Sequence, residues 1–112
     1  EELVGRALAR HPENQILIST KVGYIDRTVA RNMGNEGLRN PSALKRMIKH
    51  SMWLLRRDYL DILMVHEPNT VEWWGFDYQT GDSVIMEVLE DLKKEGVIGA
   101  IGMGGWLCDT NG

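Results

Sequence analysis

The sequence predicts an α/β fold with parallel strands, and three observations support this prediction. Apolar residues recur at helical spacing in three segments of the chain. Three short runs of continuous apolar residues alternate with these segments, a pattern typical of strands buried on both faces of a parallel sheet. The alternation repeats with a period of about forty residues, as in successive β-α-β units.

The composition is that of a soluble globular protein and excludes several other classes. Of the 112 residues, 43% are apolar and 26% are charged, which argues against disorder. A net charge of -3 argues against a nucleic-acid partner, since phosphate neutralisation needs a basic face. The charge-free stretch at residues 97–108 is shorter than the roughly 20 apolar residues of a membrane span. The single cysteine, Cys108, cannot form an internal disulfide, so we expect a reducing, cytoplasmic location.

Residues 1–10 form the first predicted helix, because one helical face collects Leu3, Val4, Ala7 and Leu8. No capping residue precedes its first turn, so we expect the chain to begin inside a helix. The first predicted strand, residues 15–23, is a continuous apolar and β-branched run. Residues 24–40 are polar and contain glycines, which predicts a loop.

A second helix is predicted to begin after Asn40, because this cap-type residue precedes Pro41, which suits a first helical turn. Its apolar stripe consists of Leu44, Met47, Ile48, Met52 and Leu55. The second predicted strand, residues 60–66, is stopped by Pro68, since proline cannot continue central pairing.

Residues 69–82 follow as a long predicted loop that contains Trp73, Trp74, Phe76 and Tyr78. Such a loop either forms a lid over a site or packs down as a surface turn, and the sequence leaves both interpretations open. The third predicted helix, residues 83–95, ends in basic residues and is followed by a glycine, as the helix dipole and a left-handed cap favour. Residues 97–103 form the third predicted strand.

Candidate chemistry lies where the strands end, since parallel strands bring their carboxyl ends to one edge of the sheet. Period-two alternation makes Lys21 and His66 point to the same side from neighbouring strands, which lie about 4.8 Å apart. Alone, such a lysine is more often solvated and such a histidine more often structural. Together at one edge they favour an acid–base site. Asp58 and Asp61 are expected to be structural residues at the opposite edge.

Other motifs carry little weight. His66 and Glu67 begin like the zinc motif H-E-x-x-H, but Thr70 occupies the position of the second histidine and the pair ends a strand rather than lying on a helix. We therefore predict no metal site. The glycines of residues 96–105 do not form the nucleotide-binding pattern G-x-G-x-x-G, and we expect them to allow close backbone approach.

Several segments resemble the aldo-keto reductase family. Residues 18–21, Ile-Ser-Thr-Lys, are similar to the family's third strand with its catalytic lysine. Residues 58–68, with the pattern Asp-Tyr-Leu-Asp-Ile-Leu followed by Val-His-x-Pro, are similar to the fourth strand with its catalytic histidine. Residues 1–8 resemble the helix after the second strand, and residues 89–102 resemble the next helix and the fifth strand. The resemblance covers nearly the whole chain.

This resemblance implies a (β/α)8 TIM barrel, of which residues 1–112 would be a single fragment, from the second helix through the fifth strand. Three parallel strands alternating with helices are under half of a barrel that typically needs about 250 residues. The remainder of its own barrel is then the expected structural partner. The implied cofactor is NADPH, with NADH as an alternative, and the implied substrate is a small carbonyl compound or sugar.

The resemblance also implies the roles of individual residues. In the family, hydride passes from the nicotinamide to the carbonyl carbon while a tyrosine protonates the oxygen. Lys21 matches the lysine that, paired with an aspartate, lowers the pKa of that tyrosine, and His66 matches the histidine that orients the carbonyl. The tyrosine and the aspartate precede, in the family pattern, the residue that matches Glu1.

One departure concerns the end of the fifth strand, where the family commonly has Gly-x-Ser-Asn. This chain instead has Gly104 and Gly105 after Met103, which leaves backbone groups to hold the nicotinamide. Glu67 takes a position often filled by an aromatic residue in relatives. The expected lining of the substrate pocket is Gly23, Glu67, Trp73 and Trp74.

Three interpretations stay open at this point, of which the third is another α/β barrel enzyme that matches the family by chance. The first is an NADPH-dependent oxidoreductase that reduces aldehydes or ketones, or oxidises the corresponding alcohols or sugars. The second is a non-catalytic barrel that acts as a regulatory or binding subunit. An aspartate and a tyrosine upstream of Glu1 would favour the first, and these 112 residues alone are expected to be inactive.

Overall fold

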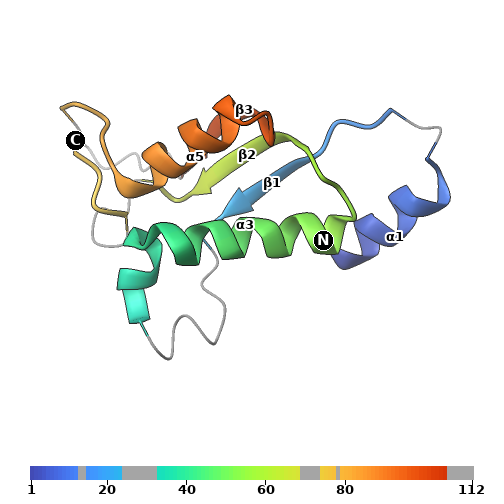
Figure 1. The fold of residues 1–112 in the computed structure, drawn as a ribbon, viewed down its shortest axis with the longest axis horizontal. Coiled ribbons are helices and arrows are strands. Elements are labelled where there is room, and N and C mark those ends of the chain that lie inside the picture. Colours follow the sequence, from blue (N-terminus) through green and yellow to red (C-terminus); the bar gives the residue numbers. More distant parts are fainter. Residues whose placement is uncertain (13–14, 24–32, 69–73, 78, 106–112) are drawn as a thin grey trace, which may run out of the picture.

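The computed structural model describes residues 1–12, 15–23, 33–68, 74–77 and 79–105 (Figure 1). They form a three-stranded parallel sheet in the order β1, β2, β3, with helices between the strands along the chain. This confirms the predicted α/β class with parallel strands. The elements are α1 (Glu2–Arg10), β1 (Ser19–Val22), η1 (Gly34–Arg39), α3 (Pro41–Leu55), β2 (Leu60–His66), α5 (Val84–Lys94) and β3 (Ile98–Gly104).

The two longer helices begin at capping side chains. The side-chain oxygen of Asn40 accepts a hydrogen bond from the backbone N–H of Ala43 at 2.9 Å, and Pro41 occupies the first turn of α3. The hydroxyl of Ser83 accepts from the backbone N–H of Met86 at 3.3 Å. Both helices therefore begin where the sequence predicts, because a side chain satisfies a backbone donor of the first turn.

Alternation along β2 separates a covered face of the sheet from a more open one. Leu63 and Val65 are buried and belong to the core, which α3 and α5 complete with residues such as Leu44, Ile48, Ile85 and Leu89. Ile62, Met64 and His66 alternate with them and are only partly buried. The residues expected to carry chemistry therefore lie on the face opposite the helices.

The prediction that residues 15–23 form one buried strand is wrong for its first part. Strand pairing extends only over β1, and Leu17 is 77% exposed. The backbone N–H of Ile18 donates to the carboxylate of Asp61 at 2.8 Å, and its carbonyl accepts from the backbone N–H of Ile62 at 3.1 Å. Pairing between β1 and β2 therefore begins at Ile18. The side chain of Asp61 accepts the hydrogen bond from the N–H of Ile18, which precedes the first paired residue of β1.

Two further boundaries differ from the predictions. The predicted loop at residues 24–40 contains the short helix η1, which is stabilised by the fully buried side chain of Leu38. The third strand includes Gly104, because this residue pairs with His66 at the end of β2. Residues 24–32 of that loop lie outside the described residues.

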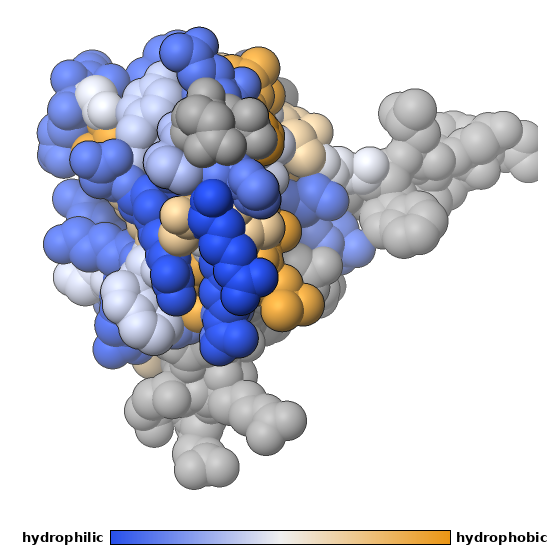
Figure 2. Space-filling view, turned by 90° about the vertical axis from the view of Figure 1, so that its right-hand side faces the viewer, coloured by the Kyte–Doolittle hydropathy of each residue, from blue (hydrophilic) through white to orange (hydrophobic). Residues whose placement is uncertain are grey.

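At the other end of the molecule, α1 packs against the C-terminal end of α3 (Figure 1). The contact occurs at Gly5, where a β-carbon would stand 2.9 Å from the backbone carbonyl carbon of Leu55. The end of the molecule that carries α1 is largely hydrophilic, with hydrophobic side chains gathered along one side (Figure 2). The exposed apolar residues of this part of the chain include Leu3, Val4, Ile16 and Leu17.

None of the helices within the described ranges has both the length and the apolar character needed to cross a membrane.

Candidate active site

Lys21 and His66 lie on the same face of the sheet, on adjacent strands, at the edge where the strands end. Lys21 is the penultimate residue of β1 and pairs with Met64, which lies two residues before His66 on β2. Residues two apart in a strand share a face, so the amine and the imidazole both project from the face opposite the helices. Lys21 is exposed and His66 is partly buried.

The side chain of Lys21 extends across β2 toward β3. A β-carbon on Gly104 would lie 3.2 Å from the Cε atom of Lys21 and 3.4 Å from the Cε atom of Met64. Gly104 is in turn the pairing partner of His66. The amine end of Lys21 therefore lies over the strand position next to His66, and the missing side chain of Gly104 leaves it room.

Met64 and Gly102 also shape this face, although they were not among the expected site residues. A β-carbon on Gly102 would stand 2.8 Å from the Cγ atom of Met64, so the methionine lies directly on the glycine backbone. The glycines of β3 were expected to allow close approach of other groups. At Gly102 the group that approaches is the side chain of Met64. The alternation of β2, which places Met64 beside Lys21 and His66, is the sequence signal that could have revealed this contact.

Trp74 and Gly23 join the ends of β1 and β2. The indole Nε1 of Trp74 donates a hydrogen bond to the backbone carbonyl of His66 at 2.9 Å. A β-carbon on Gly23 would lie 2.6 Å from the Cζ2 atom of Trp74 and 3.1 Å from the Cβ atom of His66. With a φ of 131°, Gly23 also has a backbone conformation that suits only glycine.

Trp74 was expected to line the substrate pocket, and this assignment stays a prediction. Its side chain is 1% exposed and belongs to the hydrophobic core, and it contacts the strand ends at Gly23 and at the carbonyl of His66. Of the two interpretations of the aromatic loop, Trp74 supports the one in which the loop packs down. Trp73 and Tyr78 lie outside the described residues.

Glu67 changes the direction of the chain after β2. Its φ of 48° is left-handed, which is uncommon for a residue with a side chain. Its backbone N–H donates to the carbonyl of Gly104 at 2.8 Å and so extends the contact between β2 and β3 beyond the strand. Glu67 is partly buried at the same edge as His66, and Gly105 is exposed beyond the end of β3.

The end of β3 suits a flat ring such as a nicotinamide, because no side chain projects from it at Gly104 or Gly105. The carbonyl of Gly104 already accepts from Glu67, so the backbone of Gly105 and the second lone pair of that carbonyl are the groups left to hold a carboxamide. Lys21 brings a positive charge to the same place. These residues fit the expected cofactor.

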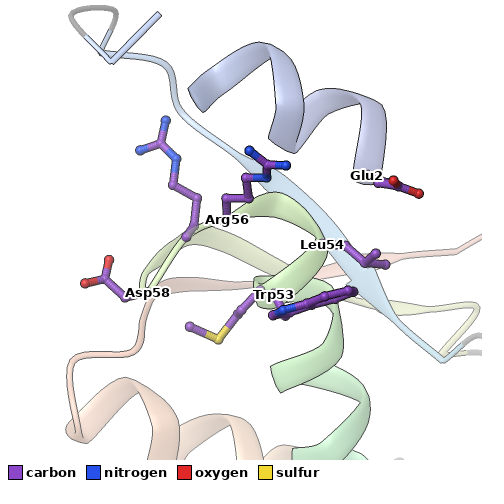
Figure 3. Close-up of a pocket in the computed structure, with 7 residues that line it drawn as sticks. Glu2, Trp53, Leu54, Arg56 and Asp58 are labelled. Carbon is purple, nitrogen blue, oxygen red and sulfur yellow. The ribbon is translucent and has the colours of Figure 1, made fainter. Parts of the chain in front are cut away.

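A cavity of about 680 Å³ lies at the opposite end of the sheet, between α1 and the end of α3 (Figure 3). Arg56, Arg57 and Trp53 line it together with Glu2 and Asp58, and the carboxylate of Glu2 is paired with Arg6 at 2.7 Å. The expected site residues do not line it, so the candidate site is the edge where β1, β2 and β3 end. Among the described residues, histidine, cysteine and carboxylate side chains form no group of three that could hold a metal ion.

Comparison with known proteins shows which proteins the chain is similar to. The family model described as "Aldo/keto reductase family" matches residues 1–109. The NADH-specific methylglyoxal reductase of Escherichia coli (strain K12) is 29% identical over 114 residues, covering 91% of this chain and 32% of that protein. Norsolorinic acid reductase B of Dothistroma septosporum is 28% identical over 106 residues, covering 92% of this chain and 25% of that protein.

The fold is similar to solved structures as well. An aldo-keto reductase from Bacillus halodurans, in its holo form, matches with a TM-score of 0.65 and 28% identity, over 93% of this chain and 31% of that chain. The chain thus spans about a third of the length of that protein and of the Escherichia coli reductase, whose printed shares are 31% and 32%. Since the family model matches almost every residue, the chain belongs to the aldo/keto reductase family.

Proposed function

We propose that the full-length protein is an NAD(P)H-dependent oxidoreductase that reduces aldehydes or ketones, or oxidises the corresponding alcohols or sugars. The observation that carries this proposal is the shared position of Lys21 and His66 on one face, beside the glycine backbone of β3. The reductase activity named for both sequence relatives supports the same class of reaction.

Each residue has a distinct task in this proposal. The imidazole of His66 donates a hydrogen bond to the carbonyl oxygen of the substrate, and so orients it and stabilises the charge that develops on it. The ammonium group of Lys21 adds positive charge and favours the deprotonated form of a neighbouring proton donor. That donor is the tyrosine that the family pattern places before residue 1. When bound, the nicotinamide supplies the hydride.

The cofactor would be held at Gly104 and Gly105 through backbone groups. We propose NADPH as the cofactor and keep NADH as the alternative, since the Escherichia coli relative is named as NADH-specific. The substrate is a small carbonyl compound or sugar, and methylglyoxal is the first compound to test. Glu67, at the same edge, would contribute an acidic group to the pocket.

The test uses the full-length protein, with its gene sequenced upstream of residue 1. Carbonyl-dependent oxidation of NADPH and of NADH is measured with methylglyoxal and with other small aldehydes and ketones. We expect turnover with at least one cofactor, together with an aspartate and a tyrosine in the upstream sequence. A folded full-length protein that lacks either residue and turns over none of these carbonyls would instead be a non-catalytic barrel.

A further inference from the structure

We propose that Trp74 is a positioning residue that holds His66, and with it the end of β1, in place for the reaction. The proposal rests on the proposed function, in which His66 and Lys21 act on the substrate and its proton donor. It assigns Trp74 a different role from that of a residue lining the substrate pocket.

The first argument is the peptide group between His66 and Glu67, which is held from two sides. Its carbonyl oxygen accepts from the indole Nε1 of Trp74 at 2.9 Å, and its N–H donates to the carbonyl of Gly104 at 2.8 Å. The oxygen and the hydrogen of a trans peptide point in opposite directions, so one bond restrains the group from each side. The backbone that carries the imidazole is thereby fixed between the aromatic loop and β3.

The second argument is the contact of the same indole with β1. The pairing of β1 with β2 ends at Val22 and Val65, one residue before Gly23 and His66. Beyond that pair, the ring of Trp74 lies against Gly23, where a β-carbon would come within 2.6 Å of it. One buried side chain therefore contacts both strand ends, two residues after Lys21 and at His66 itself.

The third argument is burial. Trp74 is 1% exposed, so water cannot readily replace its N–H if the indole donor is lost. The carbonyl of His66 would then lack this partner, and the peptide would turn to find another. A change in the orientation of the imidazole follows, because this carbonyl belongs to the residue that carries the imidazole.

The experiment compares Trp74→Phe with Phe76→Leu in the full-length protein. Trp74→Phe keeps an aromatic ring against Gly23 and removes the donor, whereas Phe76 is a partly buried aromatic residue of the same loop. We expect Trp74→Phe to lower kcat about 10-fold and to change KM by less than about 2-fold, because orientation of the reacting group is lost while binding is kept. Phe76→Leu should retain the wild-type kcat.

A second readout follows the His66 ring directly. In NMR spectra without cofactor, the His66 Cε1–H resonance should shift or broaden in Trp74→Phe and should stay unchanged in Phe76→Leu. If Trp74→Phe does not fold, position 74 is filled with 3-benzothienylalanine, which has the shape of tryptophan but no N–H. The same changes are expected there, because only the donor is removed.

The outcomes separate this proposal from the proposed function. If Lys21→Met and His66→Ala abolish turnover but Trp74→Phe keeps both the wild-type kcat and the wild-type His66 resonance, the positioning role is overturned alone. If Lys21→Met and His66→Ala leave turnover unchanged, the proposed function fails, and the NMR comparison still decides whether Trp74 restrains His66.

Discussion

The Cε atom of Lys21 lies 3.2 Å from the position that a β-carbon on Gly104 would occupy, although the two residues stand on strands separated by β2. Because Gly104 has no side chain, it leaves room for the end of the Lys21 side chain. Lys21 passes over Met64 and reaches the level of His66, because nothing projects from β3 at that point. The relative placement of the two candidate catalytic residues depends on this glycine.

Gly104→Ala should lower kcat of the full-length protein by about 3-fold to 10-fold. The new methyl group would push the end of Lys21 aside by a few tenths of an ångström, and reacting groups tolerate little displacement. Steady-state kinetics and calorimetric titration with the nucleotide distinguish two roles for the glycine. A fall in kcat with unchanged nucleotide affinity indicates spacing of Lys21, whereas a loss of affinity alone indicates a role only in holding the cofactor. Ala100→Ser, on the same face of β3 but exposed and farther from Lys21, is the matched control.

Lys21→Met should reduce kcat by about 100-fold or more, because the substitution keeps the aliphatic stem and removes the charge that assists proton transfer. Lys49→Met removes an exposed charge on α3, away from the site, and should leave kcat unchanged. Stopped-flow or steady-state measurement of cofactor oxidation provides the comparison. Substantial turnover by Lys21→Met would show that the amine is not part of the proton-transfer machinery.

Asp61→Ala should destabilise the protein by about 1–3 kcal/mol. The carboxylate of Asp61 accepts from the backbone N–H of Ile18 at 2.8 Å, and its removal leaves a part-buried donor without this partner where β1 meets β2. Asp58→Ala, at a nearby exposed position, should change stability by less than about 0.5 kcal/mol. Urea unfolding monitored by circular dichroism measures both variants, and equal effects would contradict a stabilising role for the hydrogen bond between Ile18 and Asp61.

Arg56→Gly should stabilise the protein by up to about 1 kcal/mol. Arg56 ends α3 with a φ of 54° and a ψ of 42°, a left-handed conformation that glycine adopts without steric cost. Arg57→Gly is the control, since Arg57 is not among the described residues with a positive φ and gains only flexibility from the change. Thermal unfolding should show a higher Tm for Arg56→Gly and an unchanged or lower Tm for Arg57→Gly.

Local patterns were sufficient to predict much of the fold. The helix starts at Asn40 and Ser83 follow from side chains that bond within their own first turn. The shared face of Lys21 and His66 follows from period-two alternation and from the common edge of parallel strands. The helix caps and the alternation of side chains along a strand each depend only on residues a few positions apart in the sequence.

Contacts between distant segments could not be predicted in the same way. The apolar residues Ile16 and Leu17 have the composition of a buried strand. They are exposed because no neighbouring strand in the described part of the chain pairs with them, and the local sequence does not show this. The bond between Ile18 and Asp61 joins residues 43 positions apart, and neither has a local sequence signal for it. The burial of Trp74 depends on the space that Gly23 leaves just after β1, about fifty residues earlier in the chain, so the sequence alone could not decide whether the aromatic loop forms a lid or a packed turn.

The opposite environments of two tryptophans make them optical reporters for separate parts of the molecule. Trp53 is 72% exposed at the end of α3, whereas Trp74 is 1% exposed and bonded to the carbonyl of His66. A soluble quencher such as iodide should reach Trp53 in the folded protein and reach Trp74 only after the strand ends open. With Trp73 and Trp106 replaced by phenylalanine, fluorescence quenching would follow the candidate site and the far end of α3 independently in one sample.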